Sequence, residues 1–88
     1  MKALLQPVEL RWIDSAVTKN WDTVSGMKET GPVECRTIGY LLQIDKDVVK
    51  VVQSRYADNP QIEARVADMI AIPRACVRKI TLIRRSHA

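Results

Sequence analysis

Five basic residues close to the carboxyl end of the chain are its strongest candidates for chemistry. No acidic residue interrupts them, and they are Arg74, Arg78, Lys79, Arg84 and Arg85. The formal net charge of the whole chain is a modest +4. Because guanidinium and ammonium groups attract phosphates, the cluster predicts contacts with single-stranded RNA or DNA. The alternative is that these side chains only keep a strand edge and a tail solvated.

Residue types that support catalysis or metal binding are sparse. Cys35 and Cys76 lie far apart and neither has a partner at metal-ligand spacing, so both fit buried positions in a reduced cytosol better than a disulfide. Asp45 and Asp47 suit a hairpin turn, where aspartate bonds to the backbone, better than a metal site. His87 is close to the chain end and is expected to be inert. The sequence predicts no catalytic residue, no metal, no cofactor and no enzyme activity.

The length of 88 residues predicts a single domain, 1–88, with flexible ends at 1–7 and 84–88. A domain of this size often gains stability by oligomerising. No apolar run reaches the length of a membrane span, and the amino-terminal segment is too short for a signal-peptide core. We therefore expect a cytoplasmic protein with no membrane contact.

The first strand is indicated by alternating apolar and polar residues. It is expected from Val8 to about Ala16, with Val8, Leu10 and Trp12 directed to the core. A core role for Trp12 is favoured over a base-stacking role.

Residues 17–32 are rich in turn formers and predict a long ordered loop with at most one helical turn. Asp22 is a possible cap for that turn, and Gly26 weakens it. Trp21, in this loop, is either an exposed contact or a loop anchor.

A β-hairpin follows the long loop. Residues 33–45 form a long strand whose apolar phase changes midway, with Gly39 at the switch, where a glycine allows neighbouring backbone to approach closely. A polar turn at 45–47 leads to a returning strand at 48–56. A bend of this kind is typical of a small barrel.

Two further strands complete the predicted sheet. A turn at 57–60 and a linker at 61–65 precede a strand at 66–72, which Pro73 ends because it lacks a backbone N–H. Residues 73–76 are a tight connection with room for one 3₁₀ turn, and 77–83 is the last strand. The pattern predicts five strands and an all-β fold.

The hairpin and the last connection resemble the two sequence motifs of the Sm-like family. The first motif is matched in spacing by Gly39, Leu41, Ile44, Asp45, Val48 and Val52, and the second by the segment from Ile72 to Val77, with Pro73-Arg74 in place of Arg-Gly. The resemblance implies a five-stranded, strongly bent Sm-like (SH3-type) barrel with a long loop after the first strand. It also implies a homo-oligomeric ring and, in the family, RNA binding.

Three departures concern the family's base-binding pocket. Asp47 stands where the family has a stacking ring, Val49 stands where it has the asparagine that reads the base, and Arg74 is displaced by one position. The resemblance therefore implies the scaffold without this pocket. Segments around Trp12, Cys35 and Cys76 also resemble small proteins of tailed phages and prophages.

Two functions follow as expectations. The first is a ring-forming, phage-related scaffold or assembly module that binds nucleic acid weakly and without sequence specificity through the basic residues at the carboxyl end. The second is an accessory module that binds another phage or host protein and has no nucleic-acid role.

Overall fold

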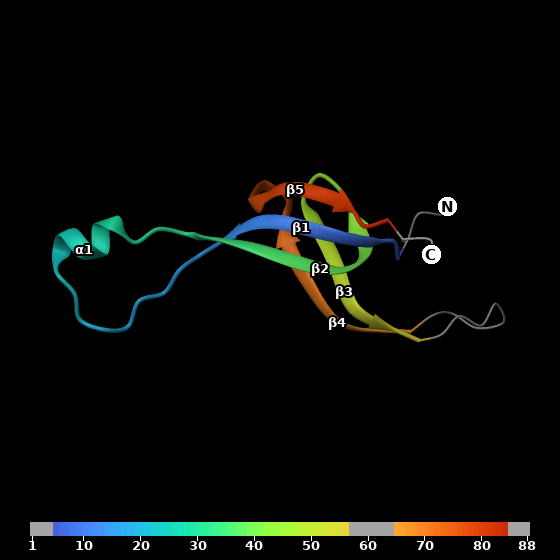
Figure 1. Ribbon diagram of the computed structural model, residues 1–88, viewed down its shortest axis with the longest axis horizontal. Helices are drawn as coiled ribbons and strands as arrows, with labels where there is room; N and C mark the ends of the chain where they lie inside the picture. Colours follow the sequence, from blue (N-terminus) through green and yellow to red (C-terminus); the bar gives the residue numbers. More distant parts are fainter. Residues whose placement is uncertain (1–4, 57–64, 85–88) are drawn as a thin grey trace.

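The computed structural model describes residues 5–56 and 65–84 and has an all-β fold, as expected from the sequence. Five antiparallel strands form one sheet in the order β4-β3-β2-β1-β5 (Figure 1). The elements are β1 (Pro7–Asp14), α1 (Val24–Glu29), β2 (Val33–Ile44), β3 (Val48–Arg55), β4 (Val66–Pro73), the 3₁₀ helix η1 (Arg74–Cys76) and β5 (Val77–Leu82). The sheet is not closed, because β4 and β5 lie at its two edges. The predicted turn at 57–60 and most of the linker at 61–65 lie outside the described residues.

The hairpin of β2 and β3 is confirmed. Its strands pair on both sides of an irregularity between Leu41 and Gln43. Leu41 lies opposite Val51, and after the shift Ile44 lies opposite Val49. An odd-numbered and an even-numbered residue of β2 therefore pair with valines that are buried on one face of β3. A β-bulge therefore produces the phase change that the sequence suggested, and it lies beyond Gly39 rather than at it.

Gly39 marks the point where the sheet divides into two ribbons. Pairing of β2 with β3 begins only at Tyr40 and Val52, whereas β2 stays paired with β1 along 33–40 and β3 stays paired with β4 as far as Arg55. A Cβ at Gly39 would lie 2.8 Å from the Val52 carbonyl oxygen, which confirms the predicted close approach. The two ribbons leave this point in different directions (Figure 1).

The buried side chains of the core are aliphatic and come from β1, β3, β4 and β5, and Leu41 of β2 packs against them. The fully or nearly buried members are Val8, Leu10, Val49, Val51, Val52, Ile72 and Val77. Burial of each such side chain stabilises the fold by about 1.5–3 kcal/mol. Val8 and Leu10 occupy the predicted inward positions, while Trp12 is only partly buried and packs against the core. Its indole N–H donates a hydrogen bond of 2.9 Å to the Thr37 hydroxyl.

The connection between β1 and β2 contains more helix than the sequence predicted. A six-residue helix, α1, replaces the single turn, and Thr23 rather than Asp22 caps it by accepting a hydrogen bond from the Gly26 N–H at 3.0 Å. Asp22 instead accepts from the Thr23 N–H at 2.7 Å. A Cβ at Gly26 would lie 2.5 Å from the Asp22 carboxylate. The glycine that lowers helix propensity therefore makes room for the residue that precedes the cap.

We call residues 15–32 the arm, because they project away from the sheet (Figure 1). No residue of the arm is buried. β1 ends at Asp14, two residues before its predicted end, because its ladder with β2 begins at Val33 opposite Asp14. Within the described residues, no helix is long and apolar enough to cross a membrane.

The connection between β4 and β5 is as tight as predicted. Pro73 ends β4, η1 occupies 74–76, and Val77 starts β5. Only three residues thus join the two edge strands of the sheet, which requires the sheet to curl strongly. The Arg74 N–H donates to the Asp47 carbonyl oxygen at 2.9 Å, so this corner is bonded to the β2–β3 turn.

Candidate nucleic-acid interface

The cations predicted at the carboxyl end do not form one cluster. Arg74 lies in η1 and is half-buried, whereas Arg78 and Lys79 are exposed in the first half of β5. Arg84 is exposed beyond the other end of β5, and Arg85 lies outside the described residues. The length of β5 therefore separates Arg84 from the other cations. The remaining basic group consists of Arg74, Arg78 and Lys79, at η1 and the start of β5.

The cross-strand register extends this basic group onto β1 and β2. Lys79 lies opposite Arg11 in the β5–β1 ladder, and Arg11 lies opposite Arg36 in the β1–β2 ladder. Arg78 occupies the extra position of a bulge between the Arg11–Lys79 and Trp12–Val77 pairs of the β1–β5 ladder. Three cations thus form a row across three strands, and like charges placed directly opposite one another are unfavourable.

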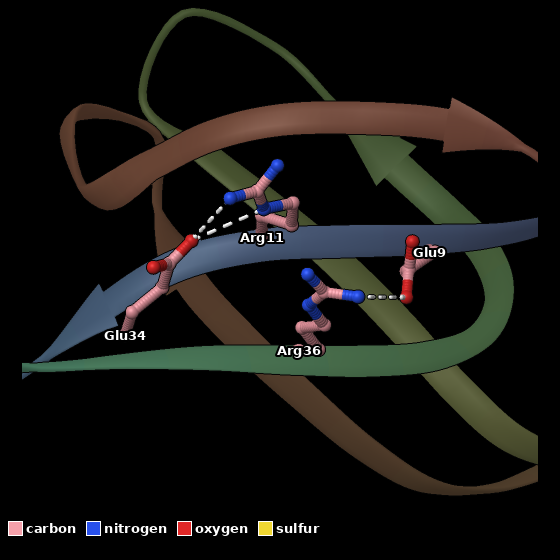
Figure 2. A network of polar contacts seen from close by, with 4 residues as sticks. All are labelled: Glu9, Arg11, Glu34 and Arg36. Carbon is pink, nitrogen blue, oxygen red and sulfur yellow. Dashed lines mark hydrogen bonds and ion pairs between the residues drawn. The ribbon is translucent and has the colours of Figure 1, made fainter.

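Two carboxylates on the same strands offset this repulsion (Figure 2). Arg11 donates to Glu34 through Nε at 3.1 Å and Nη2 at 2.8 Å, and Arg36 lies 3.9 Å from Glu9. Both pairs are diagonal across the β1–β2 ladder, two residues away from the direct partner. Because the pairs are solvent-exposed, each contributes about 0–1 kcal/mol. A phosphate at this row would compete with Glu9 and Glu34, and Lys79 is the cation of the row that forms no ion pair within the described residues.

Asp45 organises the β2–β3 turn. One carboxylate oxygen accepts from the backbone N–H groups of Asp47 at 2.8 Å and Val48 at 2.9 Å, and the other accepts from the Gln43 amide at 2.8 Å. Donation by Gln43, followed by the two backbone donors, lowers the pKa of Asp45 below its ordinary value. Asp45 thus acts as a turn residue, as the sequence indicated.

The remaining motif positions serve the fold. Gly39, Val52, Ile72 and Val77 are buried, Leu41 packs on the core, Val48 is half-buried and Ile44 is partly exposed at the end of β2. Val49, at the position of the family's base-reading asparagine, is fully buried in the core. Its side chain therefore cannot contact a ligand.

The ribbon of β3 and β4 carries a pocket that sequence reasoning missed. It has a volume of about 450 Å³ and is lined by Ser54, Arg55, Tyr56, Arg65, Val66 and Ala67. The guanidinium of Arg55 lies 5.1 Å from the centre of the Tyr40 ring, a cation–π distance. The pocket lining itself combines Tyr56 with Arg55 and Arg65, whereas the predicted basic residues have no aromatic residue in their sequence segment.

Other candidates remain separate from these sites. Trp21 is fully exposed on the arm, together with Val17 and Val24, so of the two predicted roles the exposed position is confirmed. Cys35 and Cys76 are both free and half-buried. Within 5–56 and 65–84, no group of three or more potential ligand residues could hold a metal ion. His87 lies outside the described residues.

The missed residues have only weak signals in the sequence. Arg11 and Arg36 alternate with apolar residues on predicted strands, but their apposition with Lys79 depends on two strand registers. The predicted strand at 48–56 ends in the polar segment Ser54-Arg55-Tyr56. Arg65 lies beside this segment only because Arg55 pairs with Val66, and the sequence does not reveal that pairing. Comparisons with protein-family models, with curated proteins and with solved structures find no match.

Proposed function

We propose that this chain is a ring-forming scaffold with an Sm-like barrel, of the kind encoded by phages, that binds single-stranded nucleic acid weakly and without sequence specificity. In this proposal, β4 of one copy pairs with β5 of the next. The observation that carries it is the open sheet with exposed apolar residues on both edges. Val66 and Met69 on β4 are 39% and 51% exposed, and Leu82 on β5 is 56% exposed.

Edge pairing satisfies two requirements of these strands at once. An edge strand has unpaired backbone N–H and C=O groups that another strand can bond, and pairing would cover the apolar side chains beside them. Asp68 has a left-handed φ of 62° and Pro73 has no N–H, so the regular part of the β4 edge is 69–72. Because β4 and β5 are different surfaces, their contact is heterologous, and such contacts close into rings when the rotation allows it.

The Sm-like assignment is supported by the placement of the two motif segments. Gly39 allows the close approach to β3, Asp45 holds the turn, and η1 provides a very short connection between the edge strands. The hydrogen bond from Arg74 to Asp47 joins the two segments, although they lie far apart in the chain. These features agree with what the sequence resemblance implies.

The nucleic-acid role is supported by the exposed cations on and beside β5. Lys79, Arg78 and Arg84 are exposed, and Arg11 and Arg36 extend the basic row. Contacts of this kind bind the phosphate backbone, depend strongly on salt and carry little sequence information. The carboxylates of Glu9 and Glu34 limit the attraction, which fits a weak interaction.

Light scattering coupled to size-exclusion chromatography tests the ring. We expect the wild-type chain to form a discrete oligomer and Met69→Lys to shift it toward monomer, because a charge on an edge strand blocks pairing. Ile38→Lys is the matched control, since Ile38 is exposed on β2, inside the sheet. A monomeric wild type, or equal behaviour of both variants, would contradict edge pairing.

Fluorescence anisotropy with labelled single-stranded RNA and DNA tests the nucleic-acid role. We expect micromolar binding that weakens as salt rises, and a loss of binding in the double variant Arg74→Glu/Arg78→Glu with assembly intact. Flat titrations of the wild type would remove the nucleic-acid part of the proposal.

A second candidate function, a protein-interaction module without a nucleic-acid role, is favoured by the arm. Its apolar side chains Val17, Trp21 and Val24 are exposed, and its charges, Lys19 and Lys28 against Asp22 and Glu29, balance. A neutral apolar surface suits a protein partner better than a phosphate backbone. This function would be supported over the first by a discrete oligomer that binds neither RNA nor DNA.

A further inference from the structure

We propose that the pocket on the β3–β4 ribbon binds one nucleotide of a single-stranded nucleic acid, with its base against Tyr56 and its phosphate at Arg65. This inference rests on the nucleic-acid part of the proposed function and assigns it a subsite away from β5. The residues that carry it are Tyr56 and Arg65, and the other described lining residues are Ser54, Arg55, Val66 and Ala67.

The backbone pairing of the ribbon fixes how the pocket residues meet. Arg55 lies opposite Val66, and Ser54 lies opposite Ala67. The Tyr56 N–H then donates to the Arg65 carbonyl oxygen at 2.9 Å, so Tyr56 and Arg65 occupy facing positions at the end of the ladder. The strand pairing, rather than a contact between loops, therefore places the aromatic residue and the arginine next to each other.

Arg55 borders the pocket but is already engaged. Its guanidinium lies over the Tyr40 ring of β2, and Tyr40 is not among the described lining residues. Arg65, which faces Tyr56 across the ribbon, is therefore the cation assigned to the phosphate contact.

The chemistry of the lining distinguishes a nucleotide from a simple anion. Its apolar part comes from Val66, Ala67 and the ring of Tyr56, which is 66% exposed and available for stacking. Its described charged residues are Arg55 and Arg65, and none of the described lining residues is acidic. A free phosphate would use Arg65 alone, whereas a nucleotide would use both Arg65 and the apolar surface.

The size of the pocket agrees with one nucleotide. A volume of about 450 Å³ lies within the range of about 300–1,000 Å³ that is usual for small-molecule sites. The pocket also lies on a ribbon that diverges from β1–β2 at Gly39, so it is formed by different strands from the basic row. A strand of nucleic acid bound along β5 and a base bound here would therefore depend on different residues.

Fluorescence anisotropy with a labelled single-stranded oligothymidylate, and with an abasic oligonucleotide of equal length and charge, tests the proposal. We expect Tyr56→Ala to weaken binding of the oligothymidylate by about fivefold or more, since stacking on one aromatic side chain contributes appreciably to single-strand binding. Tyr56→Phe should retain most of the affinity. Binding of the abasic oligonucleotide should be insensitive to Tyr56→Ala, because it has no base to stack.

Arg65→Gln tests the phosphate contact through the salt dependence of binding. Loss of one phosphate contact should reduce the magnitude of the slope of log affinity against log salt by about 0.7 for a single strand. Lys28→Gln, which removes one charge from the arm, is the control and should leave both affinity and slope unchanged. Circular dichroism establishes that each variant is folded.

The outcomes separate this inference from the proposed function. If the wild type binds the oligothymidylate and both Tyr56→Ala and Arg65→Gln bind as tightly with the same slope, the pocket is not a nucleotide subsite, and the proposed function stands. Equal losses by Tyr56→Ala on the normal and abasic oligonucleotides would also overturn the stacking role. If the wild type binds neither oligonucleotide, both the subsite and the nucleic-acid part of the proposed function fail, while light scattering still decides the ring.

Discussion

Two connections between strands of the sheet differ in how far their residues are bonded to the rest of the fold. The corner formed by the β2–β3 turn and η1 is short, and Asp45, Asp47 and Arg74 bond it together. The arm between β1 and β2 is long, buries none of its residues and exposes Trp21. Since apolar burial is the main stabilising term in folding, the corner and the core beside it hold the fold, and the arm is available for contacts with other molecules.

The largest difference should appear between the core beside the corner and the arm, when an aliphatic side chain is truncated. Leu10 is fully buried in the core and Val24 is exposed on the arm. We expect Leu10→Ala to lower the free energy of unfolding by about 2–5 kcal/mol, from lost burial and a residual cavity, and Val24→Ala to change it by less than about 0.5 kcal/mol. Urea denaturation followed by circular dichroism measures both. Comparable losses would mean that the arm belongs to the folded core.

A second effect should separate the folded sheet from the arm through one glycine of each. A Cβ at Gly39 meets the Val52 carbonyl at 2.8 Å, while a Cβ at Gly31, in the arm, meets nothing within 4 Å. We expect Gly39→Ala to destabilise the fold by about 1–3 kcal/mol, because β3 must shift to relieve the overlap, and Gly31→Ala to have a negligible or slightly stabilising effect. Thermal unfolding compares them. A tolerated Gly39→Ala would show that the ribbons do not need to approach so closely.

The hairpin was predictable from the sequence because its information is local. A valine-rich β3 and an aspartate that bonds to its own turn specify two strands and their connection. The length of α1 was not predicted, because Gly26 lowers helix propensity and its contact with Asp22 is visible only in three dimensions. The position of β1 between β2 and β5 could not be predicted either, because a long connection such as the arm (15–32) does not determine how the strands it joins are paired.

The candidate site follows the same division between local and non-local information. The cations of β5 could be identified from their spacing alone. Their neighbours Arg11 and Arg36 could not, because a one-residue change of register would move either side chain to the opposite face. The pocket at Tyr56 and Arg65 depends on the β3–β4 register and therefore could not be identified before the strands were paired.

A smaller effect concerns the charge of the turn at the corner. The pKa of Asp45 is lowered by Gln43 and by the backbone donors of Asp47 and Val48. A carboxylate with a lowered folded-state pKa stabilises the fold at a pH above its unfolded-state pKa, and this contribution is lost as the pH falls through the folded value. We expect the wild type to be more stable than Asp45→Asn at pH 6, with the two stabilities converging as the pH falls below the ordinary aspartate pKa of about 3.9 and through the lower folded-state value.

Urea denaturation at a series of pH values measures this convergence. The side-chain amide oxygen of the Asp45→Asn variant would still accept from the backbone N–H groups of Asp47 and Val48. Its NH2 group cannot accept from the Gln43 amide, so the substitution removes the charge together with that one hydrogen bond. Asp14→Asn, on the exposed end of β1, is the control for a general effect of charge. A difference that persisted unchanged at low pH would mean that the charge of Asp45 does not stabilise the turn.

The smallest expected effect is on Trp21, and it is the sharpest test of the contrast between the corner and the arm. The side chain is fully exposed, so Trp21→Ala should change the free energy of unfolding by less than about 0.5 kcal/mol, although tryptophan is the largest side chain in the protein. Trp12→Phe should be clearly destabilising, because the Trp12 indole packs on the core and donates to Thr37. Quenching by acrylamide assigns the exposed emission to Trp21, since only its replacement should remove the readily quenched component. If Trp21→Ala destabilised the fold as much as Trp12→Phe, the arm would fold back on the sheet, and its apolar side chains would serve stability rather than contacts with another molecule.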